Sequence, residues 1–261
     1  MRMAAAGWDV YAGVRNPADA AALTAEGNER VKPVEIEVTN RADIASLDSR
    51  LPQSLDAVVN NAGIGVGGPI EAIPIDELRH QFEVNVIGQV AVTQAVMSRL
   101  RESRGRVVFV SSISGLVSSP MLGAYCASKF ALEAIADAMR VEVRPWRISV
   151  SLIEPGQIDT DLWRNAEATL DETVAGLAPH HRDLYAKHIQ GMRKAIPTAQ
   201  KMAVSPERVA SSIERALTSR RPRARYVSGG AGARAQAWSG RLPTAIIDTA
   251  QRSMTGVPKR A

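Results

Sequence analysis

The most constraining feature of this 261-residue sequence is an alternation of short apolar runs with longer amphipathic stretches. Each run is rich in β-branched residues and is bounded by glycine, proline, asparagine or serine, which is typical of a buried β-strand. These runs lie at residues 9–14, 31–38, 54–60, 106–110, 147–153 and 225–227. Strands that alternate with helices favour a parallel sheet covered on both faces, so we predict one α/β domain over residues 1–261.

The stretch at residues 123–144 is predicted to be a helix, because apolar residues recur at helical spacing and Pro145 ends it. Tyr125 and Lys129 are four residues apart and therefore share one face of this helix. An ammonium group favours the ionised form of a neighbouring phenol and lowers its pKa from the usual value near ~10. Tyr125 is thus a candidate acid–base group, and the alternative is a packed tyrosine beside a solvated lysine.

Three further motifs accompany this pair. Ser112 stands just past the strand at 106–110, where its hydroxyl is placed to hold a substrate oxygen. The sequence Asn-Asn-Ala-Gly at 60–63 directly follows another strand, and Asn85-Val-Ile-Gly lies inside the next predicted helix. Together with Tyr125 and Lys129, these motifs resemble those of the short-chain dehydrogenase/reductase family.

The resemblance implies a single Rossmann-like, doubly wound parallel sheet and an NAD(P)-dependent oxidoreductase. Such an enzyme transfers a hydride between NADP(H) and a carbonyl, or a secondary or primary alcohol. Tyr125 would be the acid–base group, Lys129 would lower its pKa and bind the nicotinamide ribose, and Ser112 would polarise the carbonyl. Asn85 would support a proton relay through water, and a purely structural hydrogen bond is the compatible alternative.

The resemblance also implies a cofactor preference. Arg15 ends the second strand of the family fold, where an arginine accommodates a 2′-phosphate, so NADP(H) is favoured over NAD(H). The alternative for Arg15 is an ordinary surface arginine. For the segment after residue 153, the alternative is a plain Pro-Gly turn followed by Thr160 as a helix cap. Glu37 replaces the usual aspartate that meets the adenine edge. The implied cofactor contacts are Arg15, Glu37, Val38, Asn60, Ala62, Gly63, Tyr125, Lys129, Pro155, Gly156, Ile158 and Thr160.

The start of the sequence departs from the family pattern. A first strand and a glycine-rich turn that binds the pyrophosphate are expected before residue 9 and are absent. The glycines at 63–68 match the formal spacing, but Pro69 replaces the helix that the motif requires. We expect a start codon assigned too late rather than a truncated chain. The alternative function is a truncated, non-catalytic binding or scaffold protein with impaired cofactor binding.

Residues 160–202 have no matched counterpart and are expected to form a helical lid over an apolar substrate pocket. The predicted substrate contacts are Ile113, Met121, Leu122, Gln157 and Leu162. Their character favours a lipophilic ketone, aldehyde or alcohol. The histidines in this segment lack a zinc-binding spacing, so we predict no metal. Residues 229–261 are expected to form a C-terminal extension with a helix over 233–254.

Composition and charge limit the expected location of the protein and the partners that it could bind. One cysteine, Cys126, fits a reducing cytoplasm, and the sequence has no signal peptide and no apolar run long enough to span a membrane. From Glu214 onward, ten Lys and Arg residues face two acids within a net charge of +5. This basic region is interpreted as a solvated surface, with peripheral membrane contact as the alternative. No nucleic-acid motif is present. The family resemblance implies a homodimer or homotetramer.

Overall fold

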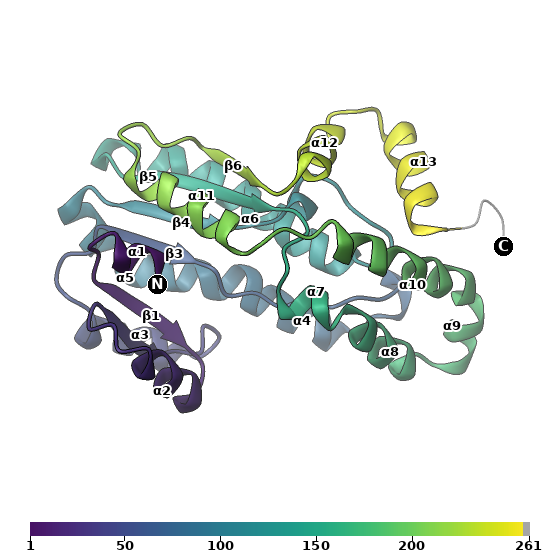
Figure 1. Cartoon of the computed structure of the whole chain (residues 1–261), viewed down its shortest axis with the longest axis horizontal. Helices are drawn as coiled ribbons and strands as arrows, with labels where there is room; N and C mark the ends of the chain where they lie inside the picture. Colours follow the sequence, from purple (N-terminus) through teal and green to yellow (C-terminus); the bar gives the residue numbers. More distant parts are fainter. Residues whose placement is uncertain (258–261) are drawn as a thin grey trace.

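The structure, a computed structural model, describes residues 1–257, apart from the side chain of Leu162. It has two parallel sheets. The larger has the order β3 (Ala57–Asn60), β4 (Arg106–Val110), β5 (Ser149–Pro155) and β6 (Arg225–Ser228). The smaller contains β1 (Val10–Val14) and β2 (Val31–Glu35). All paired strands in the described part of the chain run parallel, which confirms the predicted α/β class (Figure 1).

The two sheets are not joined by hydrogen bonds, which differs from the continuous sheet expected from sequence. β1 pairs only with β2, and β3 pairs only with β4. A cavity of about 950 Å³ lies between them, lined by residues of β1 and of β3. Within residues 1–257 no strand fills this position, so β1 and β3 each retain one edge without a ladder partner.

The first core lies between the larger sheet and helices α5 (Gln89–Ser103) and α6 (Gly123–Glu142). Val107 and Phe109 of β4 point into it and are fully buried. Leu132 of α6 packs against them and is also fully buried. Because side chains alternate across a strand, the intervening residues of β4 face the other side of the sheet.

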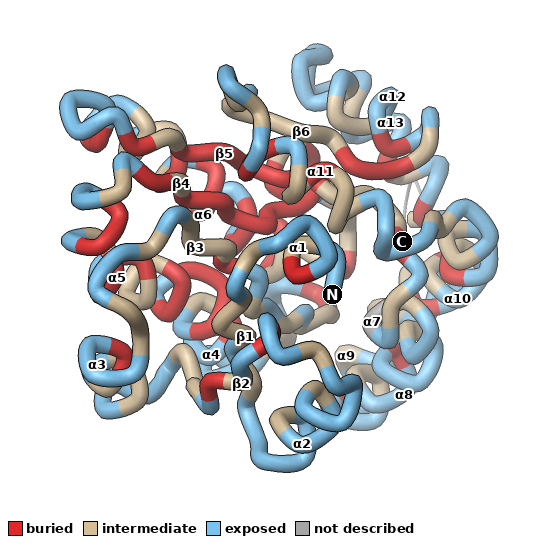
Figure 2. The backbone as a smooth tube through the Cα atoms, turned by 60° about the vertical axis from the view of Figure 1, so that its left-hand side comes forward, coloured by how far each residue is buried: buried red, intermediate tan, exposed pale blue. Residues whose placement is uncertain are grey.

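The second core lies on that opposite face, against helix α11 (Glu207–Thr218). Val108 and Ile153 of the sheet pack there with Ala216 and Leu217. Burial of both faces explains why β4 is a nearly continuous apolar run rather than an alternating one. Figure 2 shows the buried centre at β4 and β5, with helices α2 (Pro17–Ala25) and α3 (Arg41–Arg50) largely exposed.

Helices α7 to α10 lie beyond the carboxyl ends of the strands, where a lid was predicted (Figure 1). They are α7 (Asp161–Arg164), α8 (Ala166–Gly176), α9 (Pro179–Leu184) and α10 (Ala186–Lys201). Ile189 is buried against Met121 and Leu177, in agreement with the predicted apolar inner face. Leu184, the last residue of α9, is 66% exposed and does not join this cluster.

The remaining elements complete the chain. They are α1 (Arg2–Ala5), η1 (Ile70–Ala72), α4 (Ile75–Phe82), η2 (Glu83–Gly88), η3 (Ile113–Gly115), η4 (Arg144–Trp146), α12 (Ala231–Ser239) and α13 (Thr244–Thr255). The single helix predicted over 233–254 is therefore wrong. It divides into α12 and α13, because Gly240 and Pro243 interrupt the helical hydrogen bonding. In the described part of the chain, no helix is long and apolar enough to cross a membrane.

Candidate active site

Three of the predicted catalytic residues converge at the carboxyl end of β4. Tyr125 and Lys129 lie one turn apart on α6, and the Lys129 ammonium is 5.9 Å from the centre of the Tyr125 ring. Ser112 begins the short turn η3, where its hydroxyl accepts a hydrogen bond from the Ser114 amide at 3.1 Å. The Ser112 hydroxyl lies close enough to Tyr125 to favour the phenolate form of its side chain.

The pKa of Tyr125 is raised above its ordinary value, because burial penalises the phenolate; the hydrogen bond with Ser112 opposes this effect. The lowering of this pKa by Lys129 stays a prediction from the sequence. The net shift in the structure is upward, because burial is its largest cause. Tyr125 is consequently held as a neutral phenol near neutral pH.

Lys129 is not a surface lysine, which removes the alternative considered from sequence. Its side chain is only 4% exposed, and Nζ donates a hydrogen bond to the Val110 carbonyl at 2.9 Å. Burial lowers the pKa of Lys129 to about 8, although the negative charge of Glu133 acts in the opposite direction. A buried amine that titrates close to neutral pH is more common at functional sites than elsewhere.

Asn85 lies in η2, a π-helical turn between α4 and α5. Its Oδ1 accepts from the Ile64 amide at 2.8 Å, and its Nδ2 donates to the Ile64 carbonyl at 2.9 Å. Nδ2 also donates to Ser128 Oγ at 3.0 Å, on the same helix as Lys129. The structural hydrogen bond predicted for Asn85 is thus present. Together, the bonds of Asn85 join the loop at residues 63–68 to α6.

Two glycines allow these elements to approach one another. A Cβ on Gly63 would lie 3.4 Å from Asn85 Oδ1 and 3.6 Å from Lys129 Nζ. A Cβ on Gly88 would lie only 2.7 Å from the Val38 carbonyl oxygen, so any larger residue would displace the segment after β2. The packing role of Gly88 was not identified from sequence, although its place in the Asn85 motif marked the position.

Six predicted cofactor residues line the 950 Å³ cavity between β1 and β3, namely Arg15, Glu37, Val38, Asn60, Ala62 and Gly63. Asn60 ends β3 and donates from Nδ2 to Thr93 Oγ1 at 2.8 Å. The Glu37 carboxylate accepts from both the amide and the hydroxyl of Thr39, at 3.2 and 3.1 Å. Asn40 caps α3, because its side-chain oxygen accepts a hydrogen bond from the Ala42 amide at 2.9 Å.

The other predicted cofactor residues lie around the end of β5. Pro155 is its last residue, and its carbonyl is 3.4 Å from Ser112 Oγ. Gly156 packs so closely against α12 that an added Cβ would lie 2.5 Å from Ala233 Cβ. Ile158 is buried, and its carbonyl accepts the Thr160 hydroxyl at 3.3 Å. Thr160 therefore does not cap α7 through its side chain, contrary to the alternative reading.

The predicted substrate residues are only partly brought together. Ile113 and Met121 are buried, and Met121 belongs to the apolar cluster beneath α8 and α10. Leu122 and Gln157 are half-buried beside the same turns. The side chain of Leu162 lies outside the described residues. Among the described residues, no group of three or more His, Cys, Asp or Glu side chains is placed to hold a metal ion.

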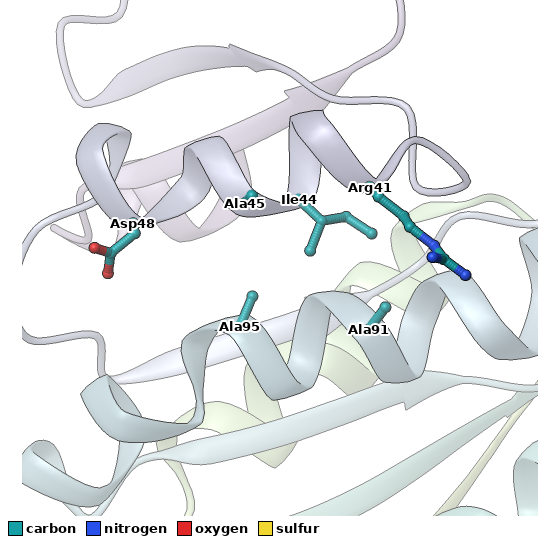
Figure 3. Close-up of a pocket in the computed structure, with 6 residues that line it drawn as sticks. All are labelled: Arg41, Ile44, Ala45, Asp48, Ala91 and Ala95. Atoms are coloured by element: carbon teal, nitrogen blue, oxygen red, sulfur yellow. The ribbon is translucent and has the colours of Figure 1, made fainter.

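Sequence reasoning missed two polar residues that build the site. Ser128 joins Asn85 to the catalytic helix, and Gln89 donates from Nε2 to the Ala62 carbonyl at 2.6 Å. Both are buried, and a polar residue inside an apolar helix face was the available signal. A second cavity of about 350 Å³ lies between α3 and α5, lined by Arg41, Ile44, Ala45, Asp48, Ala91 and Ala95 (Figure 3). It contains none of the predicted site residues.

The chain is similar to known proteins of one enzyme family. The family model described as short chain dehydrogenase matches residues 1–171, well over half of the chain. The chain belongs to the short-chain dehydrogenase family. An NADPH-dependent 3-dehydrocapnine reductase of Ornithobacterium rhinotracheale is 38% identical over 180 residues, which cover 67% of this chain and 61% of that relative. Retinol dehydrogenase 5 of Mus musculus is 31% identical, over 85% of this chain and 73% of that relative.

Solved structures of short-chain dehydrogenases share the fold. One from Streptomyces avermitilis superposes with a TM-score of 0.72 and 25% identity, covering 96% of this chain and 87% of the other. Another, from Burkholderia cenocepacia J2315 in complex with NADP, has a TM-score of 0.69 and the same identity and coverage. The chain spans about three fifths of the length of the capnine reductase, so that protein's activity is not transferred to it directly.

Proposed function

We propose that this short-chain dehydrogenase is an NADP(H)-dependent oxidoreductase that acts on a carbonyl or the corresponding alcohol. The observation that carries the proposal is the convergence of Ser112, Tyr125 and buried Lys129 at the carboxyl end of the sheet. Ligands bind at this edge in open α/β folds. The NADPH-dependent relative and the NADP complex of a structural neighbour support the cofactor choice.

The residues present fit such a cofactor. The cavity between β1 and β3 is lined by Arg15, whose guanidinium is suited to a 2′-phosphate, and by the backbone of the loop at 60–63. Gly63 lines this cavity and lies beside Lys129: a Cβ added to it would lie 3.6 Å from Lys129 Nζ. When bound, NADP(H) would donate or accept the hydride.

The chain's own residues would manage the proton and the oxygen. Tyr125 Oη, kept protonated by burial, would donate its proton to the oxygen of a bound carbonyl. The Ser112 hydroxyl would donate a hydrogen bond to the same oxygen as negative charge develops there. Lys129 would stabilise the phenolate that remains. A protonated Tyr125 favours carbonyl reduction over alcohol oxidation near neutral pH.

The substrate proposed is lipophilic. Ile113 and Met121 offer apolar, buried surface next to η3 and α6, and α8 and α10 cover Met121 from outside. Relatives named for retinol and for 17-beta-hydroxysteroid act on apolar substrates by those names, which supports the same class here. A polar ligand would leave unpaired groups in such a pocket.

Cofactor binding tests the proposal. NADPH at about 100 times its Kd should stabilise the folded chain by about 2.7 kcal/mol and raise Tm by several degrees. Reduction of a panel of apolar aldehydes and ketones should then consume NADPH. Binding without turnover of any panel member would reject the enzymatic part of the proposal.

A second function is supported by one observation. Among the described residues that line the cavity next to β1, none belongs to a glycine-rich turn that leads directly into a helix, so no backbone amides of that kind meet a pyrophosphate. A non-catalytic binding or scaffold protein with impaired cofactor binding fits this arrangement. It would show no change in Tm with NADPH or NADH, whereas the enzyme would respond to at least one of them.

Arg15→Asp tests the cofactor preference. We expect the ratio of kcat/KM for NADPH over NADH to fall at least about tenfold, because the carboxylate repels a 2′-phosphate and accepts from a 2′-hydroxyl. This ratio is measured in wild type, in Arg15→Asp and in a control variant, Arg221→Asp. The control carries an equal charge change at an exposed site outside the cavity. An unchanged ratio in Arg15→Asp would remove Arg15 from cofactor recognition.

The raised pKa of Tyr125 predicts opposite pH dependences for the two directions. Oxidation requires the deprotonated phenol, so its rate should rise with pH through the whole alkaline range. Reduction requires the protonated phenol and should stay level through neutral and mildly alkaline pH. Profiles of kcat/KM in both directions measure this, and an oxidation rate already level at pH ~7 would show a lowered pKa instead.

A further inference from the structure

A second group of ionisable side chains lies behind the candidate catalytic residues, where α6 meets β5 and β6. Arg225 of β6 contacts three carboxylates. Its Nη2 is 3.1 Å from Glu133 and 2.7 Å from Asp137, and its Nε is 3.1 Å from Glu154. The Glu133 and Glu154 side chains are only 8% and 1% exposed, whereas that of Asp137 is 41% exposed. One guanidinium therefore faces three acids, two of them removed from water.

This group continues directly into the catalytic helix. Glu133 follows Lys129 by one turn of α6, on the same face, and both residues are buried. The loop after β4 closes over this turn: a Cβ on Gly115 would lie 3.0 Å from both Glu133 Cγ and the Lys129 carbonyl oxygen. The same Cβ would lie 2.9 Å from Ser111 Oγ. Lys129 and Glu133 thus share one desolvated environment.

Two buried acids in this environment depend on the same guanidinium. Asp137, the more exposed acid, also pairs with Arg140, whereas among the described residues Glu133 and Glu154 form salt bridges with Arg225 alone. Two buried carboxylates that share one site disfavour each other's ionisation, so a proton on one of them is favoured. Glu154 is the most enclosed of the three, and Glu154 Oε1 and Glu133 Oε1 both lack a hydrogen-bond partner among the described residues.

The ionisation tendencies agree with that assignment. Burial, followed by the charge of Glu133, raises the pKa of Glu154 to about 7. Burial also raises the pKa of Glu133, but the Ser111 hydroxyl and Arg225 act in the opposite direction. Asp137, paired with Arg225 and Arg140, has a lowered pKa. The groups that face Glu133 are therefore Lys129 and Asp137 from α6, Glu154 from β5 and Arg225 from β6.

We propose that Glu133 is a positioning residue that holds Lys129 as an ammonium, and that Glu154 is the acid that carries a proton beside Arg225. Glu133 would supply the counter-charge that a buried lysine needs, from the side of α6 away from Tyr125. The neutral Glu154 leaves Arg225 free to pair with Glu133 and Asp137. The importance of Glu133 for turnover rests on the function proposed above for Lys129. The assignment of charges to these side chains does not depend on that function.

Two isosteric variants separate the roles, Glu133→Gln and Glu154→Gln. The direct readout is the pKa of Lys129, measured by NMR of lysine-labelled protein with the signal assigned by its loss in Lys129→Met. Glu133→Gln should lower that pKa by about one unit or more, because the counter-charge is lost. Glu154→Gln imitates the protonated acid and should shift it far less. Asp137→Asn, which removes the solvent-exposed acid, is the control for loss of any one negative charge.

Stability provides an independent readout for Glu154. Its pKa is about 7 in the folded protein against an ordinary 4.5, so the wild type loses stability as pH rises through this window. Glu154→Gln should lack that loss and give a flatter curve of unfolding free energy against pH. A curve parallel to the wild type would overturn the assignment of the proton to Glu154.

The outcomes distinguish this proposal from the proposed function. An unchanged Lys129 pKa in Glu133→Gln overturns the role of Glu133, whatever the enzyme activity. A lowered Lys129 pKa in Glu133→Gln together with an unchanged pH–rate profile would support the electrostatic role of Glu133. The same result would show that Lys129 does not take part in catalysis. If Glu133→Gln does not fold, Glu133→Asp replaces it. The shorter carboxylate retains the charge, so the pKa of Lys129 should stay near the wild-type value. A fall of the Lys129 pKa by one unit or more in Glu133→Asp would contradict the proposal.

Discussion

Tyr125→Phe should abolish turnover while leaving NADPH binding nearly intact. The change removes only the hydroxyl that donates to the substrate oxygen, and general acid–base groups contribute about 10²- to 10⁴-fold to rate. The aromatic ring remains, so the packing of α6 against η3 and the position of Lys129 should persist. The measurements are kcat with a saturating apolar carbonyl substrate and the change in Tm caused by NADPH.

The matched control for this prediction is Tyr226→Phe. That hydroxyl accepts a hydrogen bond from the Arg223 amide at 2.9 Å on β6, so its loss should reduce stability slightly without altering kcat. Wild-type kcat in Tyr125→Phe would remove Tyr125 from the mechanism. Loss of NADPH binding in the same variant would instead indicate a structural role for its hydroxyl.

Lys129→Met should lose both cofactor affinity and rate, and it should change how stability depends on pH. Methionine has a similar length but carries no charge, so the proposed stabilisation of the Tyr125 phenolate and the proposed contact with the nicotinamide ribose should both be lost. A loss of about 10²-fold or more in kcat/KM is expected for removing a buried charge next to the reacting oxygen.

The stability part follows from the lowered pKa of Lys129, about 8 in the folded protein against 10.5 ordinarily. Between these values the unfolded chain binds more protons, so the wild type gains stability as pH rises through this window. The variant lacks the titrating group. The unfolding free energy of wild type relative to Lys129→Met should therefore increase by about 3 kcal/mol across it.

Chemical denaturation at pH values on both sides of this window measures the effect. Lys201→Met, at the exposed end of α10, is the control and should follow the wild type at every pH. Parallel curves for wild type and Lys129→Met would mean that Lys129 titrates as an ordinary exposed amine. Unchanged kinetics would show that it does not serve the reaction.

Local patterns in the sequence predicted many of these elements because their causes are local. The apolar run at Arg106–Val110 became β4 with the predicted bounds, and the helical spacing after Gly123 became α6. Asn40 caps α3 as its residue type predicted. The chemistry of Tyr125 and Lys129 depends on a spacing of one helical turn, which the sequence shows directly.

Other features could not be predicted from local patterns. The π-helical turn at Asn85 reads as part of one long helix in the sequence, and only its bonds to Ile64 and Ser128 show its role. The separation of β1 from β3 depends on which strands exchange hydrogen bonds across the sheet. Periodicity along the chain carries no information about such pairings.

The sequence by itself determined the family and predicted the residues proposed to carry its chemistry, because type and spacing along a strand or helix are properties of neighbouring residues. Only the tertiary structure decided their charge states. Burial raises the pKa of Tyr125, lowers that of Lys129 and raises that of Glu154 beside Arg225. The cost of ionisation depends on the atoms that replace water around a group, and those atoms come from distant parts of the chain.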